Sequence, residues 1–178
     1  MAKRKAKKSV SLSETKRFWN SIVSSFKSEE ITRITENMFK SSTKKLNFES
    51  LEIPSNIKYC CLVDMIEFDD ANDRIILTEF KFTDDFPGVD IYRKGAESVL
   101  VALRLAHPHL VDLNDIKFIS EKINLTFKLV YKFKDKDDKT REYKERQRMR
   151  VISSYLSGFK NYLYKDAIPV PSDRYTFL

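Results

Sequence analysis

The 178-residue sequence contains only three glycines, too few for the glycine-rich loops that cradle phosphates in Walker and dinucleotide-binding motifs. NTP hydrolysis and nucleotide cofactors are therefore not expected. Ser-His-Asp chemistry has no motif here either. The two histidines, His107 and His109, have no cysteine or acid at metal-ligand spacing, so we predict that they cap a helix.

Cysteines and long apolar runs are also scarce. The two cysteines, Cys60 and Cys61, are adjacent in a strand-like pattern, where neighbouring side chains point to opposite faces and cannot easily be bridged. We expect both to be small core residues in a reducing, cytoplasmic compartment. No run of 18 apolar residues occurs, and the basic start MAKRKAKK is not followed by an apolar segment. We therefore expect neither secretion nor a membrane partner.

Positive charge is plentiful. Lysine and arginine total 33 against 26 acidic residues, and the formal net charge of +7 favours a polyanionic partner, the alternative being that it only aids solubility. Residues 1–10 are mostly cationic, so we predict a flexible basic arm there and a single domain over residues 11–178. The cations expected to contact DNA from this arm are Lys3, Arg4, Lys5, Lys7 and Lys8.

The periodicity of apolar residues predicts an α/β (α+β) domain with a small mixed sheet flanked by helices. A capping box at Ser11 and Glu14 opens the first helix. The strand expected at 122–133 alternates apolar and polar residues, so one of its faces should be solvated. The expected helices cover about 11–26, 28–38, 92–106 and 141–164, the expected strands about 58–68, 74–82 and 122–133, and the proline-containing tail is extended.

The sequence DDAND between the first two strands predicts a tight hairpin, because Asp and Asn tolerate the backbone conformations of such turns. If Asp70 pairs with Asp73, Asp64 lies opposite Glu79. The two-residue period then places Lys81 on the same face as Glu79. Three charged side chains thus converge in the most apolar part of the chain.

Two carboxylates followed by a lysine are suited to metal-dependent cleavage of a phosphodiester. Asp64 and Glu79 would supply hard oxygen ligands to Mg²⁺ or Mn²⁺, which keeps several waters as further ligands. Lys81 could orient the attacking water or offset charge on the scissile phosphate. Asp64, Glu79 and Lys81 are therefore the candidate catalytic residues.

The stretch LVDMIEFDDANDRIILTEFKF resembles the core motif of the PD-(D/E)XK nuclease superfamily, with Asp64 as first acid and EFK as the acid-x-lysine. The segment DIYRKGAESVLVALRLA is similar to the helix that follows this motif in archaeal Holliday-junction resolvases and RecB-type nucleases. The resemblance covers roughly residues 28–106. It implies a restriction-endonuclease-like αβββαβ core, a divalent metal and cleavage of DNA.

The resemblance also implies further site residues. The backbone carbonyl of Phe80 would join the metal ligands, and an acid from a preceding helix would complete them. Glu36 is our first choice for that acid, with Glu30 and Glu49 as alternatives. Arg93 and Lys94 open the helix expected to face DNA, although many members have a glutamine where this chain has Lys94 or Glu97.

Other interpretations remain open from the sequence. Asp64 and Lys81 could form a cross-strand ion pair with Glu79 solvated, although such a pair contributes only about 0.2 to 1 kcal/mol. A catalytically inactive protein that binds nucleic acid or assembles on the same fold is the main functional alternative, and a metal-free RNA-binding protein is a third.

The last helix bears on self-association. Val151, Tyr155 and Tyr162 lie outside its apolar seam, so either the tail or the second subunit of a homodimer should cover them. The seam consists of Met149, Ile152, Leu156, Phe159 and Leu163.

Overall fold

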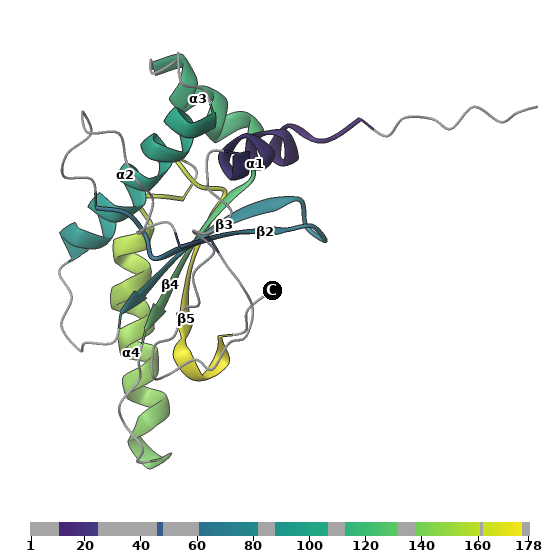
Figure 1. Cartoon of the computed structure of the whole chain (residues 1–178). Coiled ribbons are helices and arrows are strands. Elements are labelled where there is room, and N and C mark those ends of the chain that lie inside the picture. The colour runs from purple at the N-terminus through teal and green to yellow at the C-terminus, as the bar shows by residue number, and fades with distance from the viewer. Residues whose placement is uncertain are drawn as a thin grey trace, which may run out of the picture.

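The computed structural model in Figure 1 describes residues 11–24, 46–47, 61–81, 88–106, 113–131, 138–160 and 162–175. The helices are α1 (Glu14–Ser24), α2 (Gly88–Ala106), α3 (Leu113–Lys122) and α4 (Asp138–Leu156), with a 3-10 turn η1 (Ser172–Arg174). The strands are β1 (Leu46–Asn47), β2 (Met65–Asp69), β3 (Arg74–Lys81), β4 (Leu125–Tyr131) and β5 (Asp166–Pro171). The predicted arm, the helix at 28–38 and the HPH segment lie outside the described residues.

The strands form one mixed sheet in the order β1-β2-β3-β4-β5. The first three are antiparallel, whereas β4 is parallel to β3 and β5 is parallel to β4. Parallel neighbours require long crossovers, and these contain α2 and α3 after β3 and α4 after β4. The predicted α/β fold with a mixed sheet flanked by helices is confirmed, and the element order from α1 to β4 is αβββααβ, which differs from the implied αβββαβ by the additional helix α3.

The register of the β2-β3 hairpin is the one that the turn predicts. Met65 lies opposite Thr78, so the next position outward places Asp64 opposite Glu79. Because side chains of directly opposed residues share a sheet face, both carboxylates start from the same side.

The first strand is shorter than the predicted range of 58–68, because among residues 61–81 it begins only at Met65. The backbone N–H groups of Cys61 and Val63 donate to side chains of α2 instead of to a neighbouring strand. The segment before Met65 is therefore held by a helix.

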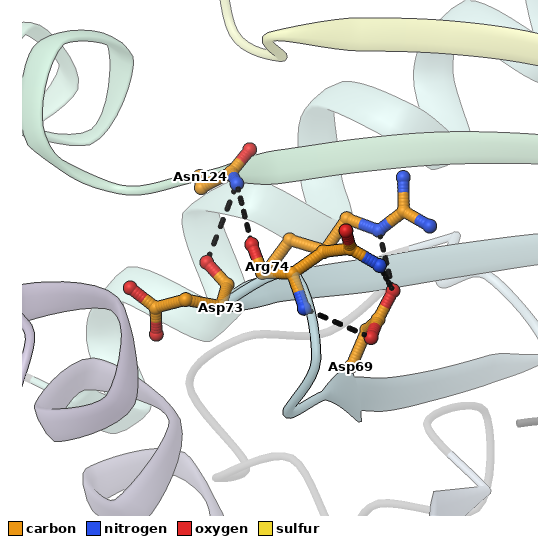
Figure 2. Close-up of polar contacts among 5 residues, drawn as sticks. Asp69, Asp73, Arg74 and Asn124 are labelled. Carbon is orange, nitrogen blue, oxygen red and sulfur yellow. Dashed lines mark hydrogen bonds and ion pairs between the residues drawn. The ribbon is translucent and has the colours of Figure 1, made fainter.

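Polar contacts hold the turn of this hairpin (Figure 2). The Asp69 carboxylate accepts hydrogen bonds from the Asn72 side chain and from Arg74 Nε, both at 2.8 Å. Asn124, just before β4, donates to the backbone oxygens of Asn72 and Asp73 at 3.4 and 3.3 Å. Asp73 has a positive φ of 46°, a conformation that Asp tolerates. The turn is thereby fixed both within itself and to β4.

The main core lies on the sheet face that carries the helices. All four described helices contribute to it, together with alternate residues of β3 and β4 such as Leu77 and Phe127. A smaller cluster on the opposite face contains Met65, Phe80 and Tyr175. Since side chains alternate along β3, Glu79 and Lys81 belong to the helix-covered face with Leu77.

The N-terminal cap of α1 differs from the prediction. The helix starts at Glu14, and Ser13 Oγ accepts a hydrogen bond from the Lys16 N–H at 3.0 Å. Ser13, and not Ser11, is therefore the capping residue, because its side chain is the one within reach of the third helical N–H.

The strand predicted at 122–133 was wrong in two respects. Residues 113–122 form α3, which was not predicted, and the strand begins at Leu125 and not at residue 122, while residues 132 and 133 lie outside the described ranges. Both faces of β4 are largely buried, so the predicted solvated face is absent from this strand. The reason is that β4 lies at the centre of the sheet, where clusters of apolar residues occupy both sides.

The last helix ends at Leu156, eight residues before the predicted end at 164. Phe159 and Leu163 of the predicted seam lie beyond it, yet both are buried in the main core. The tail is extended as predicted up to Pro171, where residues 166–171 form the edge strand β5, but Ser172–Arg174 form the 3-10 turn η1 instead. In the ranges that the structure describes, none of the helices has the length and apolar character needed to cross a bilayer.

Candidate functional site

Glu79 is the centre of a charged cluster at the open end of the β2-β3 hairpin. Its carboxylate is almost fully buried, with 1 % of the side chain exposed. Lys81 Nζ lies 2.9 Å from Glu79 Oε1. Lys94 Nζ, from α2, lies 2.9 Å from Oε1 and 3.0 Å from Oε2. The interpretation in which Glu79 is solvated is therefore wrong, because two ammonium groups pair with it inside the protein.

Asp64 joins this cluster from the segment before β2. Its Oδ1 atom lies 3.6 Å from Lys94 Nζ, and its Oδ2 atom accepts a hydrogen bond from the Phe80 N–H at 2.6 Å. Burial, reinforced by the neighbouring Glu79 carboxylate, raises the pKa of Asp64 from its ordinary value of 3.8 to about 6. The ionised form of Asp64 is thus disfavoured even with two lysines nearby.

One face of α2 positions the segment that carries Asp64. Glu97 accepts a hydrogen bond from the Cys61 N–H, and Ser98 Oγ accepts one from the Val63 N–H at 2.9 Å. Together with Lys94, these side chains are spaced three and four residues apart, so they lie on one side of the helix. The geometry of the carboxylate pair therefore depends on the placement of α2.

The first half of α2 is in turn fixed by the residues after α4. A Cβ atom on Gly95 would lie 2.7 Å from the Phe159 ring, so only glycine allows this close approach. The buried Tyr164 hydroxyl donates to the Gly95 carbonyl at 2.7 Å. Both contacts are made next to Lys94.

The two residues expected to contact DNA from α2 have different surroundings. Arg93 is half-exposed and pairs with Glu97 at 2.9 Å, away from the carboxylate pair. Lys94 is mostly buried and lies between Asp64 and Glu79. The structure therefore places Lys94 inside the charged cluster and not on an open helix face.

The cluster has the donors for a hard divalent cation. Mg²⁺ uses one or two carboxylates and keeps several waters, and Asp64 and Glu79 already hold one cationic group, Lys94 Nζ, between them. Among the described residues, no group of three or more His, Cys, Asp or Glu side chains is close enough to bind a metal. Glu36, Glu30 and Glu49 lie outside those residues, so a third acid stays a prediction.

Two further expectations have partial outcomes. The Phe80 N–H contacts Asp64, whereas the role of its carbonyl as a metal ligand stays a prediction. Cys61 is a free thiol, as expected, but it is only partly buried, and Cys60 lies outside the described residues.

Sequence reasoning placed Lys94 on the DNA-facing helix but missed its contact with the carboxylates. The available signal was the polar triplet Lys94, Glu97 and Ser98 on a helix that is otherwise largely apolar. A polar stripe on a helix that packs on a sheet indicates polar partners on the part of the protein that the stripe contacts.

Comparison with protein-family models, with curated proteins and with solved structures gives no match to this chain.

Proposed function

We propose that this protein is a metal-dependent DNA nuclease, an endonuclease or junction resolvase of the PD-(D/E)XK type. The observation that carries the proposal is the cluster of Asp64, Glu79 and Lys81 at one end of the hairpin. Three charged groups in an apolar environment contribute little to stability, since a buried ion pair often does no better than apolar residues. A role in chemistry accounts for them better.

The proposed roles follow from position. Asp64 and Glu79 would hold Mg²⁺ or Mn²⁺ together with the Phe80 carbonyl, and the metal would supply Lewis-acid activation of a water. Lys81 Nζ, 2.9 Å from Glu79, is placed to orient that water or to offset charge on the phosphate. The element order αβββααβ, which adds α3 to an αβββαβ core, is compatible with the same assignment, because Glu79 lies on β3 and Asp64 directly precedes its antiparallel neighbour β2.

DNA as the partner is supported by charge outside the cluster. Tyr143, Arg146, Gln147 and Arg150 are exposed along one side of α4, at spacings of three and four residues. Arginines interleaved with an exposed aromatic residue suit contacts with phosphates and bases.

The arm at 1–10 adds five cations, and its removal should lower the salt dependence of binding by up to about 0.9 for each phosphate that the arm neutralises. An unchanged salt dependence would make the arm a solubility tail.

A cytoplasmic location and a homodimer complete the proposal. The free thiol of Cys61 is compatible with a reducing compartment.

Val151 and Tyr162 are 51 % and 64 % exposed, which offers apolar surface to a second subunit. Sedimentation equilibrium tests this. A mass of twice the 21.0 kDa of the chain, which falls to the mass of a single chain in Tyr162→Glu, supports the dimer. A monomeric mass at tens of micromolar protein contradicts it. Phe159→Glu, a substitution in the predicted seam, is unsuitable for this test because Phe159 lies in the main core and the variant would disturb folding.

Cleavage is tested with supercoiled plasmid, linear duplex, single-stranded and four-way-junction DNA, each with Mg²⁺, Mn²⁺ or EDTA. We expect metal-dependent cleavage of at least one of these substrates. Asp64→Ala should abolish this cleavage while largely retaining DNA binding. Cleavage by Asp64→Ala at the wild-type rate would place the active site elsewhere.

The second candidate function is a nucleic-acid-binding or assembly protein without catalytic activity on the same fold. The observation that favours it is Lys94, whose ammonium group already pairs with both carboxylates. DNA binding without cleavage under every metal condition would support this candidate.

A further inference from the structure

Lys94 contacts the same carboxylates that would bind a metal. Its Nζ atom lies within 3.0 Å of both Glu79 oxygens and 3.6 Å from Asp64 Oδ1. Lys81, by contrast, contacts Glu79 through Oε1. With both lysines in place, the two positive charges cancel the two negative charges of Asp64 and Glu79.

A divalent cation and the Lys94 ammonium cannot share this position. Mg²⁺ bound by both carboxylates at about 2.0 to 2.1 Å would occupy the space between them that the Lys94 Nζ atom fills, whereas Lys81 is paired with Glu79. Like charges at such separation repel strongly where water is scarce, and Glu79 is nearly fully buried. Metal binding therefore requires Lys94 to leave the carboxylate pair.

Lys94 is able to leave. It has a flexible four-carbon stem, and 18 % of its side chain is exposed, so a route to solvent exists. Outside the pair, its ammonium group needs a new anion, and a DNA phosphate bound at the site is the anion that the proposed function supplies.

We propose that Lys94 is an exchangeable counter-ion that couples metal binding to DNA binding. Without DNA, it pairs with both Asp64 and Glu79 and keeps metal affinity low. When DNA is bound, the Lys94 ammonium group pairs with a backbone phosphate, and the two carboxylates become available to bind the metal. This inference rests on the proposed nuclease function, and by linkage the metal must raise DNA affinity by the same factor as DNA raises metal affinity.

Calorimetric titration of Mn²⁺ into the DNA-free full-length protein tests the first half. Lys94→Met should bind Mn²⁺ at least about tenfold more tightly than wild type, since such coupling factors are typical of linked sites. Lys94→Arg should stay near wild type because it keeps the charge. Lys81→Met is the matched control and should change the affinity less, because Lys81 does not lie between the two acids. Lys94→Gln replaces Lys94→Met if the latter fails to fold by circular dichroism.

The second half is tested by DNA affinity with and without Ca²⁺, measured by fluorescence anisotropy with a duplex checked for integrity on a gel. Ca²⁺ should tighten DNA binding by wild type several-fold and by Lys94→Met much less. Equal or weaker Mn²⁺ binding by Lys94→Met, or equal gains in both lysine variants, would overturn the role of Lys94 while leaving a metal site intact. Absence of metal binding in every variant, with and without DNA, would instead remove the metal site and the nuclease function with it.

Discussion

The two ends of the β2-β3 hairpin each hold a buried or partly buried aspartate, and their surroundings are opposite. At the turn, hydrogen bonds from the Asn72 side chain and from Arg74 hold the pKa of Asp69 below its ordinary value. At the open end, burial and the Glu79 carboxylate raise the pKa of Asp64 to about 6. Asp69 is thus stabilised in its charged form, whereas Asp64 is destabilised in it.

The difference separates a structural site from a candidate for chemistry. The contacts of Asp69 are local, and both of its partners, Asn72 and Arg74, belong to the same hairpin (Figure 2). Asp64 shares its cation with a second acid, so a ligand with more positive charge would be favoured there. Substitutions at the two ends should therefore have different consequences.

The largest effect is expected on cleavage. Glu79→Gln should lower the rate of metal-dependent DNA cleavage at least about a hundredfold, because it removes a metal ligand and the charge that positions Lys81. Asp69→Asn, at the other end of the same hairpin, should leave the rate per folded molecule unchanged. Single-turnover cleavage assays on both variants check this, and equal losses would end the distinction between the two ends.

The next effect concerns pH. Because the pKa of Asp64 is raised from 3.8 to about 6, its contribution to stability is fully present below pH 3.8 and is lost as the pH rises through 6. Asp64→Asn, which can still accept from Phe80, avoids this loss. In EDTA at pH 7 to 8 the variant should be more stable than wild type by up to about 3 kcal/mol, and the advantage should vanish near pH 4. Urea unfolding across this range provides the measurement; a pH-independent difference would contradict it.

A smaller loss of stability is expected at the turn. Asp69→Ala leaves Arg74 and Asn72 without their acceptor and should destabilise the protein by about 1 to 3 kcal/mol in urea unfolding at pH 7. Asp70→Ala is the matched control, since Asp70 is mostly exposed and its pair with Lys16 should contribute less than about 1 kcal/mol. Equal effects of the two alanines would show that the contacts of Asp69 are not what holds the turn.

The smallest effect is expected from the exposed arginines of α4. Arg146→Gln with Arg150→Gln should weaken DNA binding and lower its salt dependence by about 0.9 for each phosphate that these arginines neutralise. Lys117→Gln on α3, an exposed lysine paired with Glu121, serves as control and should change neither quantity. A salt titration by anisotropy distinguishes these outcomes, and an unaltered salt dependence in the double variant would exclude α4 from the DNA interface.

Local rules were enough to predict one part of the site. The turn residues and the two-residue period fixed the register of β2 and β3, and with it the approach of Asp64 to Glu79. Lys94 could not be placed this way, because its contact depends on how α2 packs across the sheet. The same limit explains α3 and the burial of both β4 faces, since the position of a strand within a sheet is not encoded in its own alternation.

The contacts around Gly95 have a consequence for synthesis of the chain. The Tyr164 hydroxyl reaches the Gly95 carbonyl across 69 sequence positions, and the Phe159 ring closes over the same glycine. A growing chain that has not yet reached these residues carries Asp64, Glu79, Lys81 and Lys94 but lacks the contacts that seat α2. We therefore expect the charged cluster to be completed only after residues 159–164 have been synthesised, and a chain that stops short of residue 159 to lack these two contacts of α2.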